Sequence, residues 1–531
     1  MRPYFLPEIK YYPIAMRNLF SYKALASHFE EIKSQSMREM FAQDANRFSK
    51  FSLELDGLLF DYSKNRINEV TLSKLIALFE ECDGPTWRNK MFSGEKINFT
   101  ENRAVQHTAL RDLENKSSAL TKKQLAVLLL VEAFAEKVKK SNITDVVNIG
   151  IGGSHLGPMF VCDALQGVAS PNLNVHFVAN VDGEEINRVL RKLNPGNTLF
   201  IVTSKSFATQ ETLTNAKFAR KWLLRSENIK NEDHFVAVTA NVEKARKFGI
   251  AEDNIFPMWD EIGGRYSMWS AVGLSIALFL GMDAYKNLLN GAHAMDEHFN
   301  NEPADKNIPV LMALLDIWNQ HFIGSSAHAI LPYDVRLTYL PAYLQQLVME
   351  SNGKSVDREG NLLDIPSSAI LFGDVGTNAQ HSFFQLLHQG TRNVSCDFIG
   401  VAKSSNENQM QHDMLLANMV GQTQALMQGQ TLEEVGEDEY AKHKVFAGNH
   451  VSNTFLLKEL NPYSLGMLLA MYEHKTFVYG VLLNINSFDQ MGVELGKRLA
   501  NNLLDKIQNE KQVADEDSST AGLIDYYKSN K

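Results

Sequence analysis

The most informative stretch of the chain is Asp145-Val-Val-Asn-Ile-Gly-Ile-Gly-Gly-Ser-His-Leu-Gly-Pro158. Its apolar run predicts a buried strand, and the glycines that follow predict a turn that leads into a helix. Backbone N–H groups at the start of such a helix form a pocket for an anion, usually a phosphate. The stretch therefore points to a protein that binds a phosphorylated small molecule, although an ordinary tight turn would give the same pattern.

The spacing of the glycines argues against two nucleotide-binding motifs. A dinucleotide fingerprint Gly-x-Gly-x-x-Gly would use Gly150 and Gly152, but its third glycine falls on His155. A P-loop ending in Gly353-Lys354 would need an earlier glycine at the position of Val348. A nicotinamide-dependent dehydrogenase is therefore disfavoured, and the P-loop fails.

Composition indicates a large soluble protein. The 531 residues are 44% hydrophobic and carry a net charge of −10, which allows several domains and argues against a nucleic-acid surface. The three cysteines are odd in number and far apart, so neither a disulfide framework nor a zinc site is expected. The first residues show no secretory signal, and the most apolar run, 125–135, is too short to span a bilayer. We therefore expect a cytoplasmic protein without a membrane or nucleic-acid partner.

Strand and helix patterns alternate along most of the chain, which predicts an α/β fold with doubly wound parallel sheets. We expect a mainly helical N-terminal segment packing on the second domain, two related α/β domains and a C-terminal arm, with bounds 1–117, 118–284, 285–509 and 510–531. The predicted strands are 145–151, 174–180, 197–203, 234–240, 254–258, 326–331, 368–373 and 394–402.

A second turn with phosphate-binding character follows the predicted strand 197–203. Ser204, Lys205, Ser206 and Thr209 supply hydroxyl donors and one ammonium at a helix start, as a phosphomonoester needs. Because the carboxyl ends of neighbouring parallel strands lie side by side, this turn and the Gly153-Ser154 turn could face one ligand. The alternative is that the hydroxyls are helix caps and the lysine is solvated.

Two charged residues are candidates for acid–base chemistry. Arg265 follows two glycines and could stabilise developing negative charge, or could simply cover Trp269. Glu350 falls in the last turn of a predicted helix over 340–354, on the same face as Gln346. The negative end of the helix dipole disfavours a carboxylate there, which suits a general base, although a surface glutamate is the alternative.

Two further segments carry possible proton-transfer groups. We expect His381 in the first turn of a helix, where a neutral imidazole can accept and donate a proton, and His388 as a hydrogen-bonded core residue. Gln490 and Lys497 lie two turns apart on one face of another predicted helix. The alternative for Lys497 is a solvated surface lysine.

Together these segments resemble the glucose-6-phosphate isomerase family, also called the phosphoglucose isomerase family. The resemblance spans nearly the whole chain, in the family's order, and is carried by 97–107, 149–158, 203–206, 263–270, 346–357, 376–381 and 488–497.

The resemblance implies two sugar-isomerase-type (SIS) α/β domains in a homodimer that needs no metal or cofactor. It implies interconversion of glucose 6-phosphate and fructose 6-phosphate, in glycolysis and gluconeogenesis, by ring opening and a cis-enediol(ate). Glu350 matches the family's base, Arg265 the residue beside the enediolate, and His381 and Lys497 the ring-opening positions, with His381 supplied by the partner subunit. The matching phosphate and substrate contacts are Gly153, Ser154, Ser204, Lys205, Ser206, Thr209, Gln346 and Gln490.

Three residues depart from the family's common pattern, and two other functions are alternatives. His155 stands where the family commonly has Asp, Ser206 where it has Thr, and Met491 where it has Trp. A sugar-phosphate sensor would keep the phosphate turns but would need neither Glu350 nor Lys497. A glucosamine-6-phosphate synthase of the amidotransferase type would need a cysteine near its N-terminus, where this chain has none.

Overall fold

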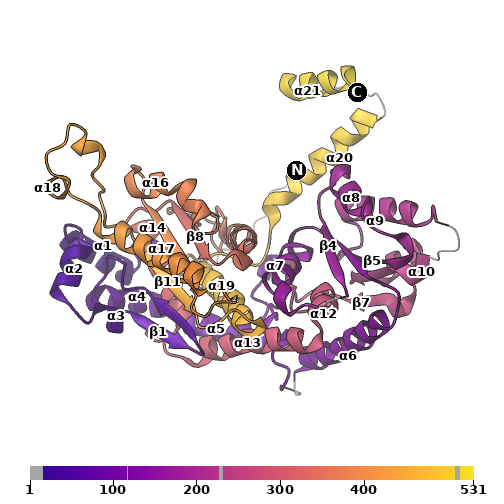
Figure 1. Cartoon of the computed structure of the whole chain (residues 1–531), viewed down its shortest axis with the longest axis horizontal. Helices are drawn as coiled ribbons and strands as arrows, with labels where there is room; N and C mark the ends of the chain where they lie inside the picture. The colour runs from indigo at the N-terminus through magenta and orange to yellow at the C-terminus, as the bar shows by residue number, and fades with distance from the viewer. Residues whose placement is uncertain (1–15, 116–117, 171, 227–230, 406, 509–514) are drawn as a thin grey trace, which may run out of the picture. The chain divides into compact units, whose positions relative to one another are not determined.

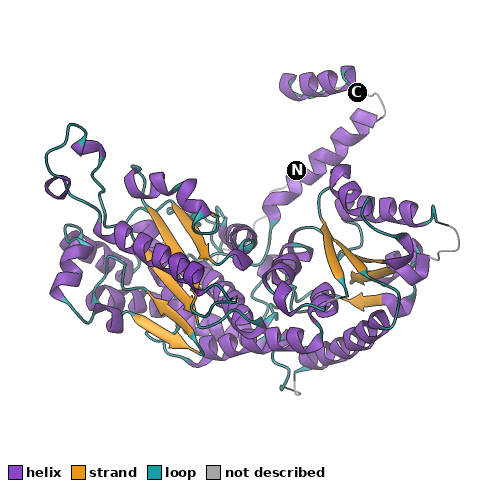
Figure 2. Ribbon diagram, viewed as in Figure 1, coloured by secondary structure: helices purple, strands orange, loops and turns teal. Residues whose placement is uncertain are grey.

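The computed structural model describes residues 16–115, 118–170, 172–226, 231–405, 407–508 and 515–531. The chain forms two compact units, Met1–Ser487 and Phe488–Lys531. The first unit contains two β-sheets, which Figure 2 shows in orange among purple helices. The chain is therefore a mixed α/β protein, as the sequence predicts.

The first sheet consists of five parallel strands in the order β4-β3-β5-β6-β7. Near-continuous apolar runs are typical of strands that are buried on both faces, and each strand lies where such a run predicts it, to within two residues at each end. The strands are β3 (Asp145–Ile149), β4 (Asn174–Val178), β5 (Thr198–Thr203), β6 (Phe235–Thr239) and β7 (Ile255–Pro257).

Helices cover both faces of this sheet (Figure 1). On one face, alternate strand residues such as Val147 and Phe200 pack with α8 (Gly183–Leu190), α9 (Gln210–Leu223) and α11 (Val242–Phe248). The other face holds α6 (Ala119–Lys139), α7 (Leu156–Ala164) and α12 (Leu274–Leu280), of which α12 contacts both of the others. The short α10 (Asn231–His234) leads into β6. The arrangement is the doubly wound sheet that the alternation predicts.

The second sheet has six strands in the order β1-β2-β11-β10-β8-β9. Four of them pair in parallel, whereas β1 and β2 form an antiparallel hairpin that joins the sheet at β11. The sheet is therefore not wholly parallel, which corrects the sequence-based expectation. The strands are β1 (Ser52–Leu55), β2 (Leu58–Asp61), β8 (Ala327–Tyr333), β9 (Ile370–Gly373), β10 (Val394–Val401) and β11 (Ser452–Leu457).

The hairpin is the main element that the sequence analysis missed. Asp56 and Gly57 connect its strands, and both adopt positive φ angles, 46° and 83°. Two such residues in succession give the tight turn that matches strand twist, and Asp-Gly is a preferred pair for it. The hairpin ties the N-terminal segment to the second sheet, because β2 pairs with β11 along four residue pairs.

The remaining helices of the first unit surround the second sheet. Helix α19 (Pro462–Leu482) is apolar around most of its circumference and is buried along nearly its full length against α13 (Met282–Asn301) and α14 (Ile308–His321). The others are α1 (Phe20–Ile32), α2 (Met37–Gln43), α3 (Arg47–Lys50), α4 (Glu69–Glu81), α5 (Gly84–Ser93), α15 (Leu340–Leu344), α16 (Phe384–Gln389), α17 (Gln409–Gln428) and α18 (Leu432–Val435).

A buried cluster of charges links the N-terminal segment to α13 and α19. The Arg111 guanidinium donates to both carboxylate oxygens of Asp296, at 2.8 and 2.5 Å, and to Glu473 at 2.5 Å. The other oxygen of Glu473 accepts from the Trp269 indole at 2.8 Å. Burial raises the pKa of Glu473 to about 7, although the field of Arg111 opposes the shift.

The second unit contains α20 (Glu494–Gln508) and α21 (Ser518–Ser529). No residue of α20 is buried. The predicted domain division stays a prediction, and its boundaries after residues 117 and 509 involve positions outside the described residues.

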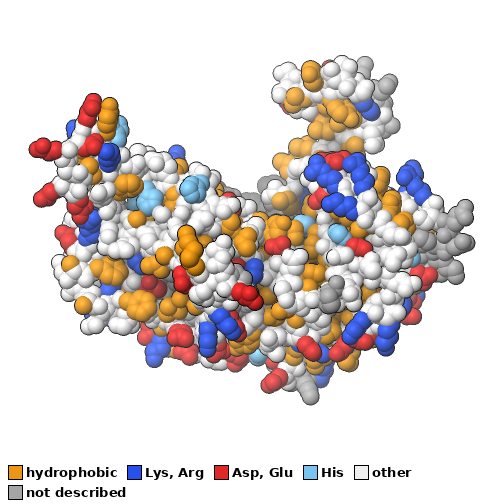
Figure 3. Space-filling model, viewed as in Figure 1, with side chains coloured by type: hydrophobic (Ala, Val, Ile, Leu, Met, Phe, Trp, Pro, Cys, Tyr) orange, Lys and Arg blue, Asp and Glu red, His pale blue; other side chains and the backbone are white. Residues whose placement is uncertain are grey.

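Acidic and basic side chains are interspersed over most of the face shown in Figure 3. Among the helices of the described ranges, none combines the length and the apolar character needed to cross a membrane.

Candidate functional site

The first phosphate-type turn follows β3 and leads into α7. Gly152–Ser154 form a short 3₁₀ turn in which Gly152 has a φ of 61°, a backbone conformation that favours glycine. His155 follows the turn, and its half-buried ring meets Phe177 edge-on at 5.8 Å. Burial lowers the pKa of His155, which favours a neutral ring beside the turn.

The second phosphate-type turn follows β5 and leads into α9. Thr209 occupies the N-cap position of α9, yet its side chain makes no capping bond. Instead, the Thr209 and Ser204 hydroxyls lie 3.0 Å apart and share a hydrogen bond. Ser204 is buried and Ser206 is exposed. The hydroxyls are thus not engaged as helix caps, which was the alternative interpretation.

Asn148 connects the two turns. Its side-chain amide donates to the Ser154 carbonyl oxygen at 3.0 Å and accepts from the Thr203 hydroxyl at 3.3 Å. Asn148 is fully buried at the end of β3, and Thr203 ends the neighbouring strand β5. The two turns therefore lie at the same edge of the sheet, as parallel strands require.

Lys205 is partly buried rather than solvated. Its ammonium donates to the carbonyl oxygens of Asp260 and Ile262 at 3.2 and 3.3 Å, and lies 3.4 Å from the Asp260 carboxylate. Burial lowers the pKa of Lys205, and the Asp260 carboxylate opposes that shift. The contacts hold a positive charge at the second turn.

Close packing brings the first turn to Arg265. A β-carbon on Gly153 would lie 2.0 Å from the Gly264 carbonyl oxygen and 2.6 Å from the Arg265 backbone nitrogen. A β-carbon on Gly152 would lie 3.0 Å from the Gln346 side-chain amide. The first turn thus touches both segments that the sequence analysis selected for chemistry.

Arg265 is buried and forms an ion pair with Glu350. Its Nη1 donates to Glu350 Oε1 at 2.9 Å, while the Glu350 side chain stays 27% exposed and so accessible to a ligand. The Arg265 guanidinium lies over the Tyr266 ring at 5.5 Å and does not cover Trp269, whose indole binds Glu473. The ion pair places a buried positive charge directly beside the carboxyl group that is the candidate general base.

The helix that carries Glu350 contains a π-helical turn. Helix α15 is followed by η11 (Gln345–Glu350), which spans both Gln346 and Glu350. Such turns are rare and frequently occur at functional sites. At the end of the helix the Lys354 ammonium donates to the Glu350 and Ser351 carbonyl oxygens, at 3.0 and 2.9 Å. The sequence predicted the helix but not its π-turn.

His381 does not lie in the first turn of a helix, so that prediction was wrong. It is the last residue of the 3₁₀ turn η12 (Asn378–His381). After this turn, the backbone N–H groups of Ser382 and Phe383 both donate to the Ala379 carbonyl oxygen. The argument from the positive helix end therefore does not apply. The His381 side chain is exposed. His388 Nε2 meets Gln422 at 2.8 Å, which confirms the expected hydrogen bond, but the residue is half-buried rather than part of the core.

Gln490 and Lys497 belong to the second compact unit. Lys497 lies on α20, is 63% exposed, and pairs with Glu494 at 2.9 Å. Their relation to the residues around Glu350 stays a prediction.

Sequence reasoning missed two partners of Arg265. Its Nε donates to the Ser351 hydroxyl at 2.7 Å, and its Nη2 donates to the Ser487 carbonyl oxygen at 2.6 Å. Ser351 directly follows Glu350, so the candidate base was a local signal that could have pointed to Ser351. Ser487 is 222 residues from Arg265 in the chain, and no local pattern points to it.

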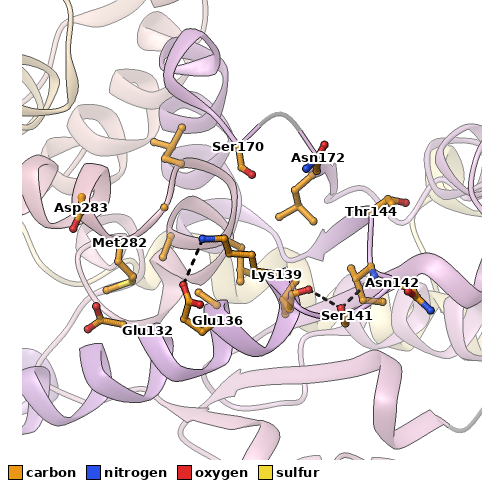
Figure 4. A pocket seen from close by; sticks show the side chains of 18 of the residues that line it. Glu132, Glu136, Lys139, Ser141, Asn142, Thr144, Ser170, Asn172, Met282 and Asp283 are labelled. Carbon is orange, nitrogen blue, oxygen red and sulfur yellow. Dashed lines mark hydrogen bonds and ion pairs between the residues drawn. The ribbon is translucent and has the colours of Figure 1, made fainter.

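A separate cavity of about 720 Å³ lies at the opposite edge of the first sheet (Figure 4). Thr144 and Asn197, which immediately precede β3 and β5, line it together with the C-terminal part of α6 and the start of α13. In Figure 4 the Lys139 ammonium turns to Glu136, 3.8 Å away. None of the predicted site residues lines this cavity.

Turns at helix starts suit a phosphate group, and a carboxylate beside a guanidinium suits proton transfer, so the site fits an acid–base enzyme for a phosphorylated substrate. The sequence model of the family described as "Phosphoglucose isomerase" matches residues 61–524. The chain therefore belongs to the phosphoglucose isomerase family.

Named relatives agree with this assignment. The chain is 50% identical to a glucose-6-phosphate isomerase from Chlorobium phaeobacteroides, over 95% of each chain. It is 48% identical to one from Methylococcus capsulatus, over 96% of this chain and 99% of the other. The crystal structure of a glucose-6-phosphate isomerase from Chlamydia trachomatis is similar with a TM-score of 0.86 at 32% identity, over 97% of this chain and 100% of that one.

Proposed function

We propose that the chain interconverts glucose 6-phosphate and fructose 6-phosphate by proton transfer through a cis-enediol(ate). The observation that carries the proposal is the Arg265–Glu350 pair at 2.9 Å, next to a turn that suits a phosphate. The reaction belongs to glycolysis and gluconeogenesis, and we expect the protein in the cytoplasm.

The phosphate group of the sugar is held by the two turns. Gly153 belongs to the first turn, where Ser154 offers its hydroxyl, and the second turn offers the hydroxyls of Ser204, Ser206 and Thr209 and the ammonium of Lys205. Support comes from Asn148, which joins the two turns at one edge of the sheet. Binding at the remote phosphate orients the reacting carbons, which lie at the other end of the substrate.

Glu350 is the base of the isomerisation. Its carboxylate takes the proton from C2 of the open-chain aldose. The electron pair left on C2 forms the C1–C2 double bond, and the π electrons of the C1 carbonyl move to its oxygen, which gives the enediolate. The same carboxyl group returns the proton to C1, while the proton of the C2 hydroxyl passes to the oxygen on C1 and C2 becomes the ketone. Arg265 stabilises the negative charge on the oxygens, and Gln346 and Gln490 contact the sugar.

Ring opening precedes the proton transfer, because both sugars are predominantly closed. We assign this step to His381 and Lys497, which move a proton from the anomeric hydroxyl to the ring oxygen as the bond between C1 and that oxygen breaks. The exposure of both side chains is compatible with exchange of protons with a ligand.

We further propose a homodimer in which the partner subunit supplies His381. The exposed position of His381 on its own chain supports this arrangement. The test mixes Glu350→Gln and His381→Ala chains, each inactive alone. If His381 acts across the interface, a mixed dimer contains one site with both residues intact, and activity returns. If His381 acts within its own subunit, every site in the mixture lacks one residue, and activity does not return.

The experiment that tests the proposed function is a coupled assay with fructose 6-phosphate on the wild-type chain and on Glu350→Gln. We expect turnover by the wild-type chain and a loss of at least about 10²-fold in kcat for the variant. A wild-type chain that binds the sugar phosphate without turning it over would contradict the proposal and favour a sensor. Full activity of the variant would remove Glu350 from its role.

A further inference from the structure

Three consecutive residues hold the Arg265 guanidinium, two directly and one through a neighbour. Glu350 accepts from Nη1 at 2.9 Å, and Ser351 accepts from Nε at 2.7 Å. The Nη2 group donates to the Ser487 carbonyl oxygen at 2.6 Å. Asn352 is the third residue, because it fixes Ser487.

The contacts of Ser487 show how Asn352 acts. The Ser487 hydroxyl donates to Asn352 Oδ1 at 2.7 Å, and Asn352 Nδ2 donates to the Thr476 carbonyl oxygen on α19 at 2.9 Å. A β-carbon on Gly480 of α19 would lie 1.9 Å from the Ser487 hydroxyl, so Ser487 packs tightly against that helix. Since Asn352 and Ser487 are both buried, the Ser487 carbonyl oxygen has little freedom to move.

Ser351 is held in a similar way. Its hydroxyl lies 3.0 Å from the Tyr266 hydroxyl, as well as 2.7 Å from Arg265 Nε. Ser351 is fully buried and Tyr266 is almost fully buried. The planar guanidinium of Arg265, with its fork of N–H donors, is therefore held from two sides by buried groups that cannot rotate into water.

We propose that Ser351 and Asn352 are positioning residues, which hold the planar guanidinium of Arg265 in the orientation that stabilises the enediolate. The inference rests on the proposed function. Preorganised donors act in the transition state without reorientation, so small displacements of such a group lower the rate steeply. The sequence Glu350-Ser351-Asn352 thus contains the base and, directly after it, the two residues that position Arg265.

The test is a pair of double-mutant cycles measured by kcat and KM for fructose 6-phosphate. Ser351→Ala and Asn352→Ala are made in the wild-type chain and in Arg265→Lys, whose ammonium cannot form the fork. We expect each single variant to lose about 10- to 100-fold in kcat with little change in KM. In the Arg265→Lys background, the same changes should cost less than about 3-fold, because the group they position is gone.

Ser487→Ala is a milder variant, which keeps the carbonyl oxygen and removes only the hydroxyl that binds Asn352. It should reproduce the direction of the Asn352→Ala effect on kcat. The matched control is Thr423→Val on α17, which removes a buried hydroxyl that donates to the Val420 carbonyl oxygen at 2.9 Å and should leave kcat unchanged.

The inference would be overturned by equal fold-losses of kcat in both backgrounds, or by an unchanged kcat in Ser351→Ala and Asn352→Ala. Isomerase activity of the wild-type chain would still support the proposed function in either case. A wild-type chain without isomerase activity would contradict the proposed function, and the inference with it.

Discussion

Gly153 lies so close to Gly264 that a β-carbon added to Gly153 would meet the Gly264 carbonyl oxygen at 2.0 Å. That contact is what joins the first phosphate-type turn to the segment of Arg265. Neither backbone can give way cheaply, because the obstructing atom is a main-chain oxygen rather than the end of a flexible side chain. Glycine at position 153 is therefore a requirement of the site's geometry.

We predict that Gly153→Ala lowers kcat/KM for fructose 6-phosphate by about 10²-fold or more, because a displacement near 1 Å suffices for such a loss. The matched control is Gly183→Ala at the start of α8, where a β-carbon would meet nothing within 4 Å. Its kcat/KM should stay within about 2-fold of wild type. Similar activity of both variants would show that the turn and Arg265 need not be in contact.

The hydroxyls of the second turn should act on binding more than on chemistry. Ser204→Ala and Thr209→Val each remove a donor to the phosphate, and hydrogen bonds to charged groups contribute about 1.5–3 kcal/mol. We therefore expect KM to rise about 10- to 100-fold with a smaller change in kcat. An unchanged KM in both variants would contradict a role of these hydroxyls in phosphate binding.

Lys205 should make substrate binding sensitive to alkaline pH. Its pKa lies below that of an ordinary lysine because of burial, so the folded chain loses this positive charge at a lower pH than a solvated lysine would. KM should rise as the pH approaches the ordinary lysine range, near about 10.4. Lys205→Arg should keep KM flat over that interval, because arginine stays charged. A wild-type KM independent of pH there would contradict the role of Lys205.

Glu473 should impose a pH dependence on stability. Its pKa is raised from 4.5 to about 7 in the folded chain, so between these values the folded state keeps a proton that the unfolded state has released. The contribution of Glu473 to the free energy of unfolding is therefore full below pH 4.5 and falls as the pH rises to about 7.

Glu473→Gln removes that titration. It is expected to be less stable overall, because the Gln amide group faces the Arg111 donors. The measured quantity is the difference in free energy of unfolding between wild type and variant, from denaturant titrations between pH 4.5 and 7. That difference should shrink as the pH rises, whereas a constant difference would show that Glu473 does not keep its proton.

The repetitive parts of the fold could be predicted from the sequence. Eight strands read as short, mainly apolar runs between helical patterns and were predicted from them. The hairpin at Asp56-Gly57 was missed because its short strands lie in a helical context, although the turn pair itself is a strong signal. Strand β11 was missed as well.

Parts of the candidate site could be predicted from local motifs. The sequence selected both turns, Arg265 and Glu350, and the fold brings these together. It could not yield contacts that depend on distant segments, such as that of Arg265 with Ser487. The π-turn before Glu350 also escaped, since nothing in the local pattern separates it from an α-helix. His381 was misplaced because a 3₁₀ turn and a helix start share the same sequence signals.

The central claim is that Glu350 carries a proton between C2 and C1, and isomerisation in D₂O tests it most directly. Over many turnovers, the wild-type chain should introduce deuterium at C2 of glucose 6-phosphate and at C1 of fructose 6-phosphate, because the proton on a carboxyl group exchanges with solvent. Glu350→Gln should introduce none. Isomerisation by the wild-type chain with complete retention of the substrate hydrogen, or deuterium incorporation by Glu350→Gln at the wild-type rate, would contradict the account.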